Sequence, residues 1–273
     1  MKGSGTSHGA VSVMNAIPCG IGSTIGIGLR TDVVIEDSDR QEVITIDRPK
    51  VRPTLAETCV RRAREAIGQD TDGGYRLEIR TEIPPSMGLK SSSSVSNAVI
   101  SAVLDAYGEK MEKIDMIKLG VECAKECKVT ITGAFDDACG CGLGGLVITD
   151  NTKNELILRK GIPDYDVVIC VPDDAIPKSK VPVERYRGLS DVYKGMVPRI
   201  EDDYLKVLTE NGRYVEDIIE RSNGSARKAM EEGALAAGIT GTGPATAVIV
   251  EKGDGKRMAE VLGCRTIISR TRC

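Results

Sequence analysis

The chain has 273 residues, of which 41% are hydrophobic and 28% charged, and its formal net charge is −3 at pH 7. This composition is typical of a globular protein with one large or two moderate cores, and the slight acidity argues against a nucleic-acid partner, which calls for a basic surface. No apolar run approaches the roughly 20 residues needed to cross a bilayer, and the first residues lack the apolar core of a signal peptide, so we expect a cytoplasmic protein without a nucleic-acid or membrane partner.

The first part of the chain alternates strand-like and helix-like segments. A glycine-punctuated apolar stretch over 10–35 predicts strands joined by a tight turn, and 42–47 predicts a further strand. Apolar residues recur with helical spacing over 55–67. Alternation of apolar and charged residues over 75–81 predicts a half-buried strand, which leads into a loop rich in glycine and serine.

A second helix is predicted over 114–128, and the glycines of 140–145 predict a turn. Two short apolar runs, 146–149 and 155–158, are typical of a hairpin. The elements predicted after this point are a strand at 165–172, a long helical region over about 187–232, a strand at 245–250, a helix at 256–262 and a strand at 265–269. Because the pattern changes near residue 155, we divide the chain into an N-terminal domain, 1–155, and a C-terminal domain, 156–273.

The most informative segment is Pro84–Ser94, which reads Pro-Pro-Ser-Met-Gly-Leu-Lys-Ser-Ser-Ser-Ser and runs directly into a helix-compatible stretch. The prolines end any strand or helix from upstream, and Gly88 allows the backbone to turn. The serines supply hydroxyls and unpaired amides at a helix start, where the positive end of the helix dipole favours an anion. The segment therefore predicts a phosphate-binding loop, with an ordinary serine cap on a core helix as the alternative.

A second glycine-rich segment, Gly238–Thr246, precedes a strand in the C-terminal domain. Its glycines allow the backbone to approach a ligand or another loop closely, or form only a tight turn. Neither glycine segment matches a Walker A loop, and no complete dinucleotide-binding fingerprint is present. The run Gly5–Gly9 satisfies the Gly-x-Ser-x-Gly pattern of serine hydrolases, but no strand precedes it and the only histidine is the serine's neighbour. A hydrolase is therefore not favoured.

Together these segments resemble the GHMP kinases, the small-molecule kinases that act on galactose, homoserine, mevalonate and phosphomevalonate. The residues that match the family's Pro-x-x-x-Gly-Leu-x-Ser-Ser loop are Pro84, Gly88, Leu89, Ser91 and Ser92. The family's acidic motif and the Gly-Gly turn after it are similar to Gly133–Ala138 and Gly144-Gly145, and its late glycine motif is similar to Gly241–Pro244. Within the family, Ser7–Ile17 and Thr132–Asp137 are most similar to the archaeal-type shikimate kinases.

This resemblance implies a two-domain α+β fold, in which an N-terminal domain like domain 2 of ribosomal protein S5 joins a ferredoxin-like C-terminal domain. It implies an ATP- and Mg²⁺-dependent transfer of the γ-phosphoryl group to a hydroxyl of shikimate, a small-molecule substrate. Homoserine kinase and mevalonate kinase are the alternatives within the family. A non-catalytic nucleotide-binding or RNA-binding module of S5-like fold is the alternative from another class.

The resemblance also assigns roles to residues. Asp136 is placed beside the attacking hydroxyl as the catalytic carboxylate, in preference to its neighbour Asp137, which can hold either role. Mg²⁺ is assigned to Ser92 and Glu126, with Glu122 one turn earlier as the alternative. The residues implied to hold ATP are Pro85, Ser86, Met87, Gly88, Leu89, Lys90, Ser91, Ser92, Ser93 and Ser94. Those implied to line the substrate site are His8, Asn15, Asp136, Gly241, Thr242 and Gly243.

Charged partners for the ligands are only partly assigned. Some family members carry a lysine in the N-terminal motif, whereas the only early lysine here is Lys2, outside any matching motif. Lys90 can bring a positive charge to the phosphates. The carboxylate of shikimate calls for an arginine, whose planar fork pairs with two oxygens, and the sequence does not select one.

Overall fold

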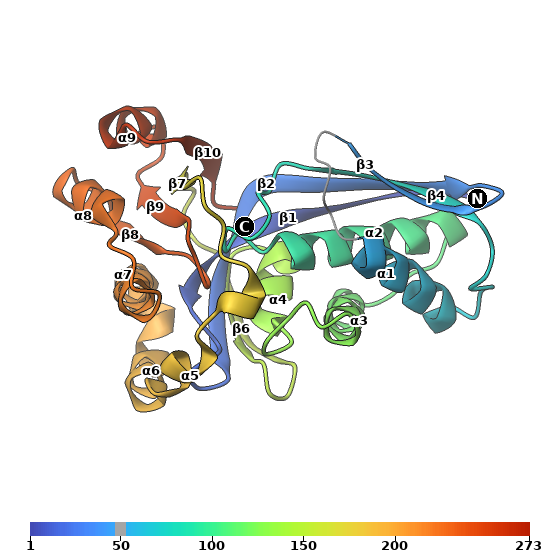
Figure 1. The fold of residues 1–273 in the computed structure, drawn as a ribbon, viewed down its shortest axis with the longest axis horizontal. Helices are drawn as coiled ribbons and strands as arrows, with labels where there is room; N and C mark the ends of the chain where they lie inside the picture. The colour runs from blue at the N-terminus through green and yellow to red at the C-terminus, as the bar shows by residue number, and fades with distance from the viewer. Residues whose placement is uncertain (47–52) are drawn as a thin grey trace.

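The computed structural model describes residues 1–46 and 53–273, which form two β-sheets lying side by side along the long axis of the molecule (Figure 1). The strands of the first sheet are β1 (Lys2–Met14), β2 (Ile21–Asp37), β3 (Gln41–Ile46), β4 (Tyr75–Thr81), β5 (Leu146–Asp150) and β6 (Glu155–Lys160). They follow the order β3-β4-β2-β5-β6, with β1 also paired to β2. The last residue of the strand predicted at 42–47 lies outside the described residues.

Strand β1 begins at Lys2, eight residues before the predicted apolar stretch. Its first half alternates between exposed and buried positions, and the buried ones are occupied by Gly3, Gly5 and Ser7. Because glycine and serine add no apolar signal, hydrophobic periodicity missed this half of the strand. The glycines are required by the helix above them: a Cβ at Gly5 would lie 2.1 Å from the carbonyl oxygen of Ala98.

Four helices accompany the first sheet: α1 (Pro53–Ala66), α2 (Ser91–Tyr107), α3 (Lys113–Glu126) and α4 (Phe135–Leu143). The turn predicted over 140–145 is wrong, because helix α4 continues to Leu143. Gly140 is helical here, and a Cβ at this position would lie 2.2 Å from the Oγ1 of Thr24. The glycines of α4 thus reflect close packing on β2 rather than chain reversal.

The second sheet has the ferredoxin-like order β10-β7-β9-β8, with every neighbouring pair antiparallel. Its strands are β7 (Asp166–Cys170), β8 (Ala236–Ile239), β9 (Thr246–Val250) and β10 (Thr266–Arg270). Strand β8 was not predicted, because Ala-Ala-Gly-Ile has little β-propensity. Helix α7 (Ile200–Ile218) packs so closely on β8 that a Cβ at Gly212 would lie 2.3 Å from the Cα of Gly238.

The region predicted as one long helix over about 187–232 is divided into several shorter elements. They are α5 (Val183–Arg187), α6 (Ser190–Met196), the 3-10 turn η2 (Val197–Arg199), α7 (Ile200–Ile218) and α8 (Gly224–Glu231). Pro198 lies at the start of η2, where a proline is tolerated because the first residues of a helical turn have no helical partner for their amides. A further 3-10 turn, η1 (Lys178–Lys180), precedes α5, and α9 (Gly255–Leu262) joins β9 to β10.

The two sheets share one apolar core and several backbone hydrogen bonds. Val11 and Ile27 of the first sheet belong to the same buried cluster as Val167 and Ile249 of the second. The amide of Arg272 donates to the carbonyl of Gly26 at 2.9 Å. The loops of the two domains are therefore held in a defined relation to one another. In the described part of the chain, no helix combines the length and the apolar character needed to cross a membrane.

The boundary predicted at residue 155 falls on the first residue of β6. Since β6 pairs with β5 in the first sheet, we propose that the division lies a few residues later, between β6 and β7.

The close contact of β1 with α2 predicts the effect of a single added methyl group. Gly5→Ala should lower the free energy of unfolding by about 1–3 kcal/mol or more, because the new Cβ meets helix backbone that cannot move aside locally. Gly195→Ala in α6 is the control: its Cβ meets nothing within 4 Å, so the free energy should be unchanged or rise by up to about 1 kcal/mol. Urea unfolding measures both, and equal midpoints would contradict the packing described.

Candidate active site

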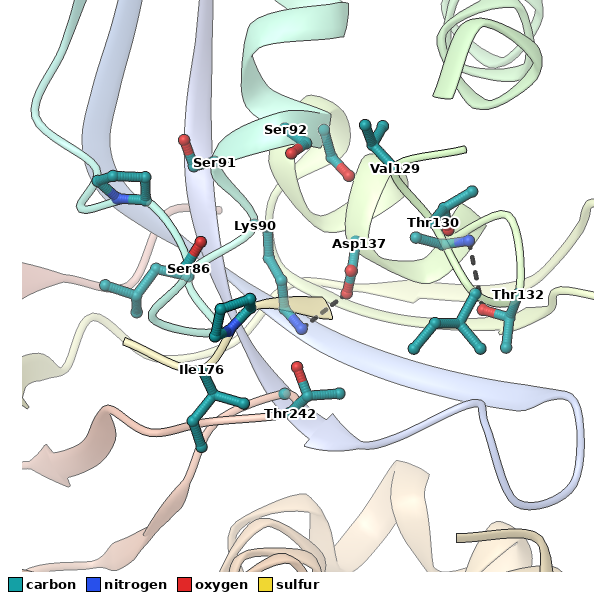
Figure 2. Close-up of a pocket in the computed structure, with 18 of the residues that line it drawn as sticks. Ser86, Lys90, Ser91, Ser92, Val129, Thr130, Thr132, Asp137, Ile176 and Thr242 are labelled. Carbon is teal, nitrogen blue, oxygen red and sulfur yellow. Dashed lines mark hydrogen bonds and ion pairs between the residues drawn. The ribbon is translucent and has the colours of Figure 1, made fainter. Parts of the chain in front are cut away.

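A cavity of about 490 Å³ lies where the glycine–serine loop faces the other domain (Figure 2). Its walls come from segments far apart in the sequence. The first domain contributes 15–17, 84–86, 88–93, 128–132 and 136–137, and the second contributes 176–177, 179 and 241–243. A concave site between two domains, with few polar groups directed inward, is the usual setting for a small ligand.

The glycine–serine loop reaches the cavity through three residues with positive φ. Ser86 has φ 58°, Gly88 φ 78° and Lys90 φ 66°. At Gly88 only glycine fits, because a Cβ would lie 2.0 Å from the carbonyl oxygen of Thr240. Lys90 is the N-cap residue of α2, and no side chain caps this helix start in the described structure.

The first turn of α2 presents its donors to the cavity. The leading amides of a helix have no partner within it, and Ser91, Ser92 and Ser93 all line the cavity. In Figure 2 the labelled Ser91 and Ser92 stand at the helix start above the open space. The arrangement offers backbone amides, hydroxyls and the positive helix end to an anion, as the sequence predicts.

Two loop residues predicted to contact the nucleotide face elsewhere. Met87 is buried in the core shared by the two sheets. The Ser94 hydroxyl donates to the Oγ1 of Thr31 at 2.9 Å beneath the helix. Neither residue lines the cavity. Composition marks the whole loop, but how the loop and the first turn of α2 pack against the rest of the protein decides which of these side chains line the cavity.

Asp136 is anchored behind the cavity wall. Its Oδ1 accepts a hydrogen bond of 2.7 Å from the Nδ2 of Asn151, and its amide donates to the Oδ1 of the same residue at 3.0 Å. Its Oδ2 lies against Gly22, where a Cβ would be only 2.4 Å away. Burial, reinforced by the negative charge of Asp137, raises the pKa of Asp136 to about 6. This carboxyl therefore touches the cavity but is held by β2 and the end of β5.

Asp137 lines the cavity as well, and its carboxylate is the more exposed of the two (Figure 2). Its Oδ1 lies 2.7 Å from the Nζ of Lys90. That ammonium also donates to the Oγ of Ser12 at 2.7 Å, and its side chain is almost fully buried. Sequence analysis favours Asp136 for the catalytic role, whereas the geometry favours Asp137. Adjacent residues on a helix point about 100° apart, and only packing decides which one faces the ligand.

The residues predicted for the substrate side are brought together with one exception. Asn15, Gly241, Thr242 and Gly243 line the cavity. The Nδ2 of Asn15 donates to the carbonyl of Gly241 at 2.8 Å, which joins the end of β1 to the glycine segment of the other domain.

His8 is the exception and lies outside the cavity. It is opposite Arg30 in the β1–β2 register. Burial, together with the charges of Arg272 and Arg30, lowers its pKa to about 4. Seven residues of extended strand separate His8 from Asn15, which corresponds to about 23 Å, so both cannot serve one small site.

Neither glutamate predicted as a metal ligand reaches the cavity. The carboxylate of Glu126, at the end of α3, pairs with Arg61 and lies 4.0 Å from Arg62. Glu122 pairs with Lys125 at 2.9 Å. Helical spacing showed that the two glutamates share a face, but the side on which that face lies depends on how α3 packs.

Several residues of the site were not assigned a role from the sequence, although Ser12 and Thr240 lie in segments that the sequence analysis singled out. Ser12, Asn151 and Thr240 hold the side chains described above, and Ile176 and Pro177 reach the cavity from the segment after β7. The arginine expected for a substrate carboxylate is not found: among the described residues lining the cavity none is an arginine, and the basic ones are Lys90 and Lys128.

Known proteins resemble this chain in sequence and in fold. The family model for the GHMP kinases N terminal domain matches residues 54–145. The chain is 41% identical to the shikimate kinase of Methanothrix thermoacetophila, over 98% of this chain and 93% of that protein. It is 34% identical to the shikimate kinase of Pyrococcus furiosus, over 96% and 95% respectively.

Solved structures share the fold at low identity. The mevalonate kinase of Methanococcus jannaschii superposes with a TM-score of 0.79 at 15% identity, over 100% of this chain and 98% of that one. The homoserine kinase of Cytophaga hutchinsonii gives a TM-score of 0.75 at 18% identity, over 100% and 95%. The chain therefore belongs to the GHMP kinase family, in the group of the archaeal-type shikimate kinases, and has the family's two-domain α+β fold.

Proposed function

We propose that this protein is an ATP-dependent shikimate kinase that transfers the γ-phosphoryl group of ATP to the 3-hydroxyl of shikimate. One observation carries the chemistry: a helix start rich in amides and hydroxyls faces a carboxylate across a single cavity. The acceptor is inferred from full-length relatives named shikimate kinase at up to 41% identity.

Phosphoryl transfer asks the protein for positioning and for stabilisation of charge on the phosphoryl oxygens. In our proposal the amides and hydroxyls of Ser91, Ser92 and Ser93 hold the polyphosphate. The glycine segment of the other domain and Asn15 close the acceptor side, and the apolar Ile176 and Pro177 exclude water from it. These groups come from both domains, which share one apolar core.

Mg²⁺ fits this site as a companion of the nucleotide. The described residues contain no cluster of three or more histidine, cysteine or acidic side chains arranged for a metal ion, but Mg²⁺ commonly takes most of its ligands from phosphates and water. Ser92 is the residue that we propose would bind it, and the position of Glu126 does not support a role for that glutamate. The ion would supply positive charge to the phosphoryl oxygens.

Asp137 is the residue that we propose acts on the acceptor hydroxyl, by orienting it or by accepting its proton. Lys90, at 2.7 Å, holds the carboxylate in one position. The loop thus provides the lysine that the N-terminal motif lacks. Asp136 supports the helix turn from behind, through Asn151.

The acceptor is tested by measuring ADP release with shikimate, homoserine and mevalonate in parallel, with an acceptor-free reaction as the control. We expect turnover with shikimate well above that of the other two and above the background. Turnover of homoserine or mevalonate without shikimate would refute the acceptor and leave the kinase assignment intact. Absence of turnover with all three would count against the kinase proposal itself.

A matched pair of variants tests the roles of the two aspartates. Asp137→Asn should lower kcat by roughly 10²–10⁴-fold, since general-base or orienting carboxylates contribute that much, with the KM for ATP changed only a few-fold. Asp136→Asn should keep most of the turnover, because the amide oxygen of the new side chain can still accept the hydrogen bond from Asn151. Steady-state kinetics decide the matter: if the Asp136 variant is the inactive one, the preference from sequence analysis is restored.

Asp136 also makes stability depend on pH. Its pKa is raised from 3.8 to about 6, so the folded protein binds this proton more tightly than the unfolded chain does. The contribution of Asp136 to the free energy of unfolding therefore falls as the pH rises from about 4 to about 6 and is constant above. The free energy of unfolding of Asp136→Asn, measured relative to that of the wild type, should therefore rise by about 1–2 kcal/mol between about pH 4.5 and pH 7. Urea unfolding at each pH measures this, and a difference that does not vary with pH would contradict it.

A further inference from the structure

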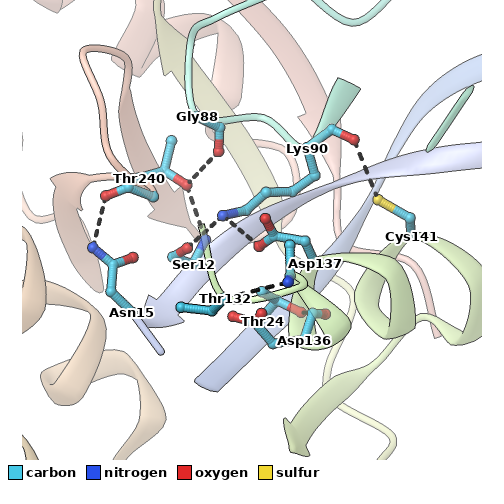
Figure 3. A network of polar contacts seen from close by, with 12 residues as sticks. Ser12, Asn15, Thr24, Gly88, Lys90, Thr132, Asp136, Asp137, Cys141 and Thr240 are labelled. Carbon is cyan, nitrogen blue, oxygen red and sulfur yellow. Dashed lines mark hydrogen bonds and ion pairs between the residues drawn. The ribbon is translucent and has the colours of Figure 1, made fainter. Parts of the chain in front are cut away.

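Thr240 lies where the phosphate loop, strand β1 and the second domain meet (Figure 3). It follows β8 directly and is 1% exposed. Its backbone is fixed within the glycine turn, since its amide donates to the carbonyl of Ala245 and its carbonyl accepts from the amide of Gly243, both at 3.0 Å. Its side chain therefore leaves the second domain from a rigid base.

The Thr240 hydroxyl makes one bond to each of two elements of the first domain. It accepts a hydrogen bond of 2.9 Å from the amide of Ser12 in β1. It donates to the carbonyl of Gly88 in the phosphate loop at 3.3 Å. The hydroxyl thus uses its acceptor and its donor capacity at once, and its removal leaves a buried amide and a partly buried carbonyl without this partner.

Both contacts lead to the residues that face the ligand. Gly88 lies two residues before Lys90, the N-cap residue of α2. The orientation of the Gly88 backbone therefore affects the direction of the amides at the start of α2. Ser12, the other partner, accepts from the ammonium of Lys90, which pairs with Asp137. Figure 3 shows this chain of contacts from Thr240 through Ser12 and Lys90 to Asp137.

We propose that Thr240 is a positioning residue, through which the second domain sets the phosphate loop and the Lys90–Asp137 pair in their working geometry. The inference rests on the proposed function only in assuming that the loop binds the nucleotide. It does not depend on which alcohol is phosphorylated. The hydroxyl, and not the bulk of the side chain, carries the effect.

The test compares Thr240→Val, which keeps the shape and removes the hydroxyl, with Thr240→Ser, which keeps the hydroxyl. Thr246→Val is the control, because Thr246 is a buried threonine of the same sheet whose hydroxyl donates to Asn223 at 3.0 Å, away from the loop. Calorimetry measures the affinity of each protein for AMP-PNP with Mg²⁺. Urea unfolding measures stability, and kinetics give kcat and the KM for ATP.

We expect Thr240→Val to weaken AMP-PNP binding and to raise the KM for ATP by roughly tenfold, the effect of one lost hydrogen bond, and to lower kcat. Thr240→Ser should stay within about threefold of wild type, and Thr246→Val should lose stability without a change in nucleotide affinity. If Thr240→Val does not fold, Thr240→Cys, with its weak donor and acceptor, replaces it and should show a smaller loss in the same direction.

Two outcomes would overturn the proposal. In one, Thr240→Val loses stability as Thr246→Val does and keeps wild-type affinity for AMP-PNP, so that the hydroxyl is only structural. In the other, Thr240→Ser is as impaired as Thr240→Val, so that the methyl group matters instead. A wild-type protein that binds AMP-PNP but does not phosphorylate shikimate would refute the proposed acceptor and leave this inference standing.

Discussion

Lys90 belongs to the glycine–serine loop, yet its ammonium is buried between the carboxylate of Asp137 and the hydroxyl of Ser12. When one partner of a buried ion pair is lost, the other charge is left uncompensated at a cost of about 3–5 kcal/mol. The pair therefore ties the start of α2 firmly to the first turn of α4 and sets the distance between the two walls of the cavity. With the lysine engaged in this way, amides and hydroxyls are the groups that remain for an anion at the helix start.

The two adjacent aspartates divide their tasks according to their surroundings. Asp136 is surrounded by β2 and Asn151, and burial raises its pKa. Asp137 faces the cavity beside a lysine. Two identical side chains in one helical turn thus have different surroundings, because one is enclosed by protein, which disfavours its charged form, and the other is paired with a lysine at the cavity. In our proposal only the second carboxylate acts on the acceptor, and the first keeps the turn in place.

The architecture by itself does not select the acceptor. Mevalonate and homoserine kinases share this fold at 15–18% identity, so a fold of this kind serves different alcohols. In our proposal the acceptor is selected by a few segments that line the cavity, namely the end of β1, the residues after β7 and the glycine segment after β8. The contact of Asn15 with Gly241 and the contacts of Thr240 join these segments across the domain boundary. Rigid joining of this kind allows residues from both domains to form one site.

The sequence by itself determined the features that depend on neighbours in the chain. The loop over 84–94 was predicted because prolines, a glycine and serines at a helix start act locally, and most of the regular elements followed from their periodicity. Tertiary structure alone decided which aspartate is the more exposed in the cavity, that His8 and Glu126 lie outside it, and that Ser12 and Thr240 support it. These outcomes depend on which side of a strand or helix is covered by a segment distant in the sequence, and local composition holds no record of that packing.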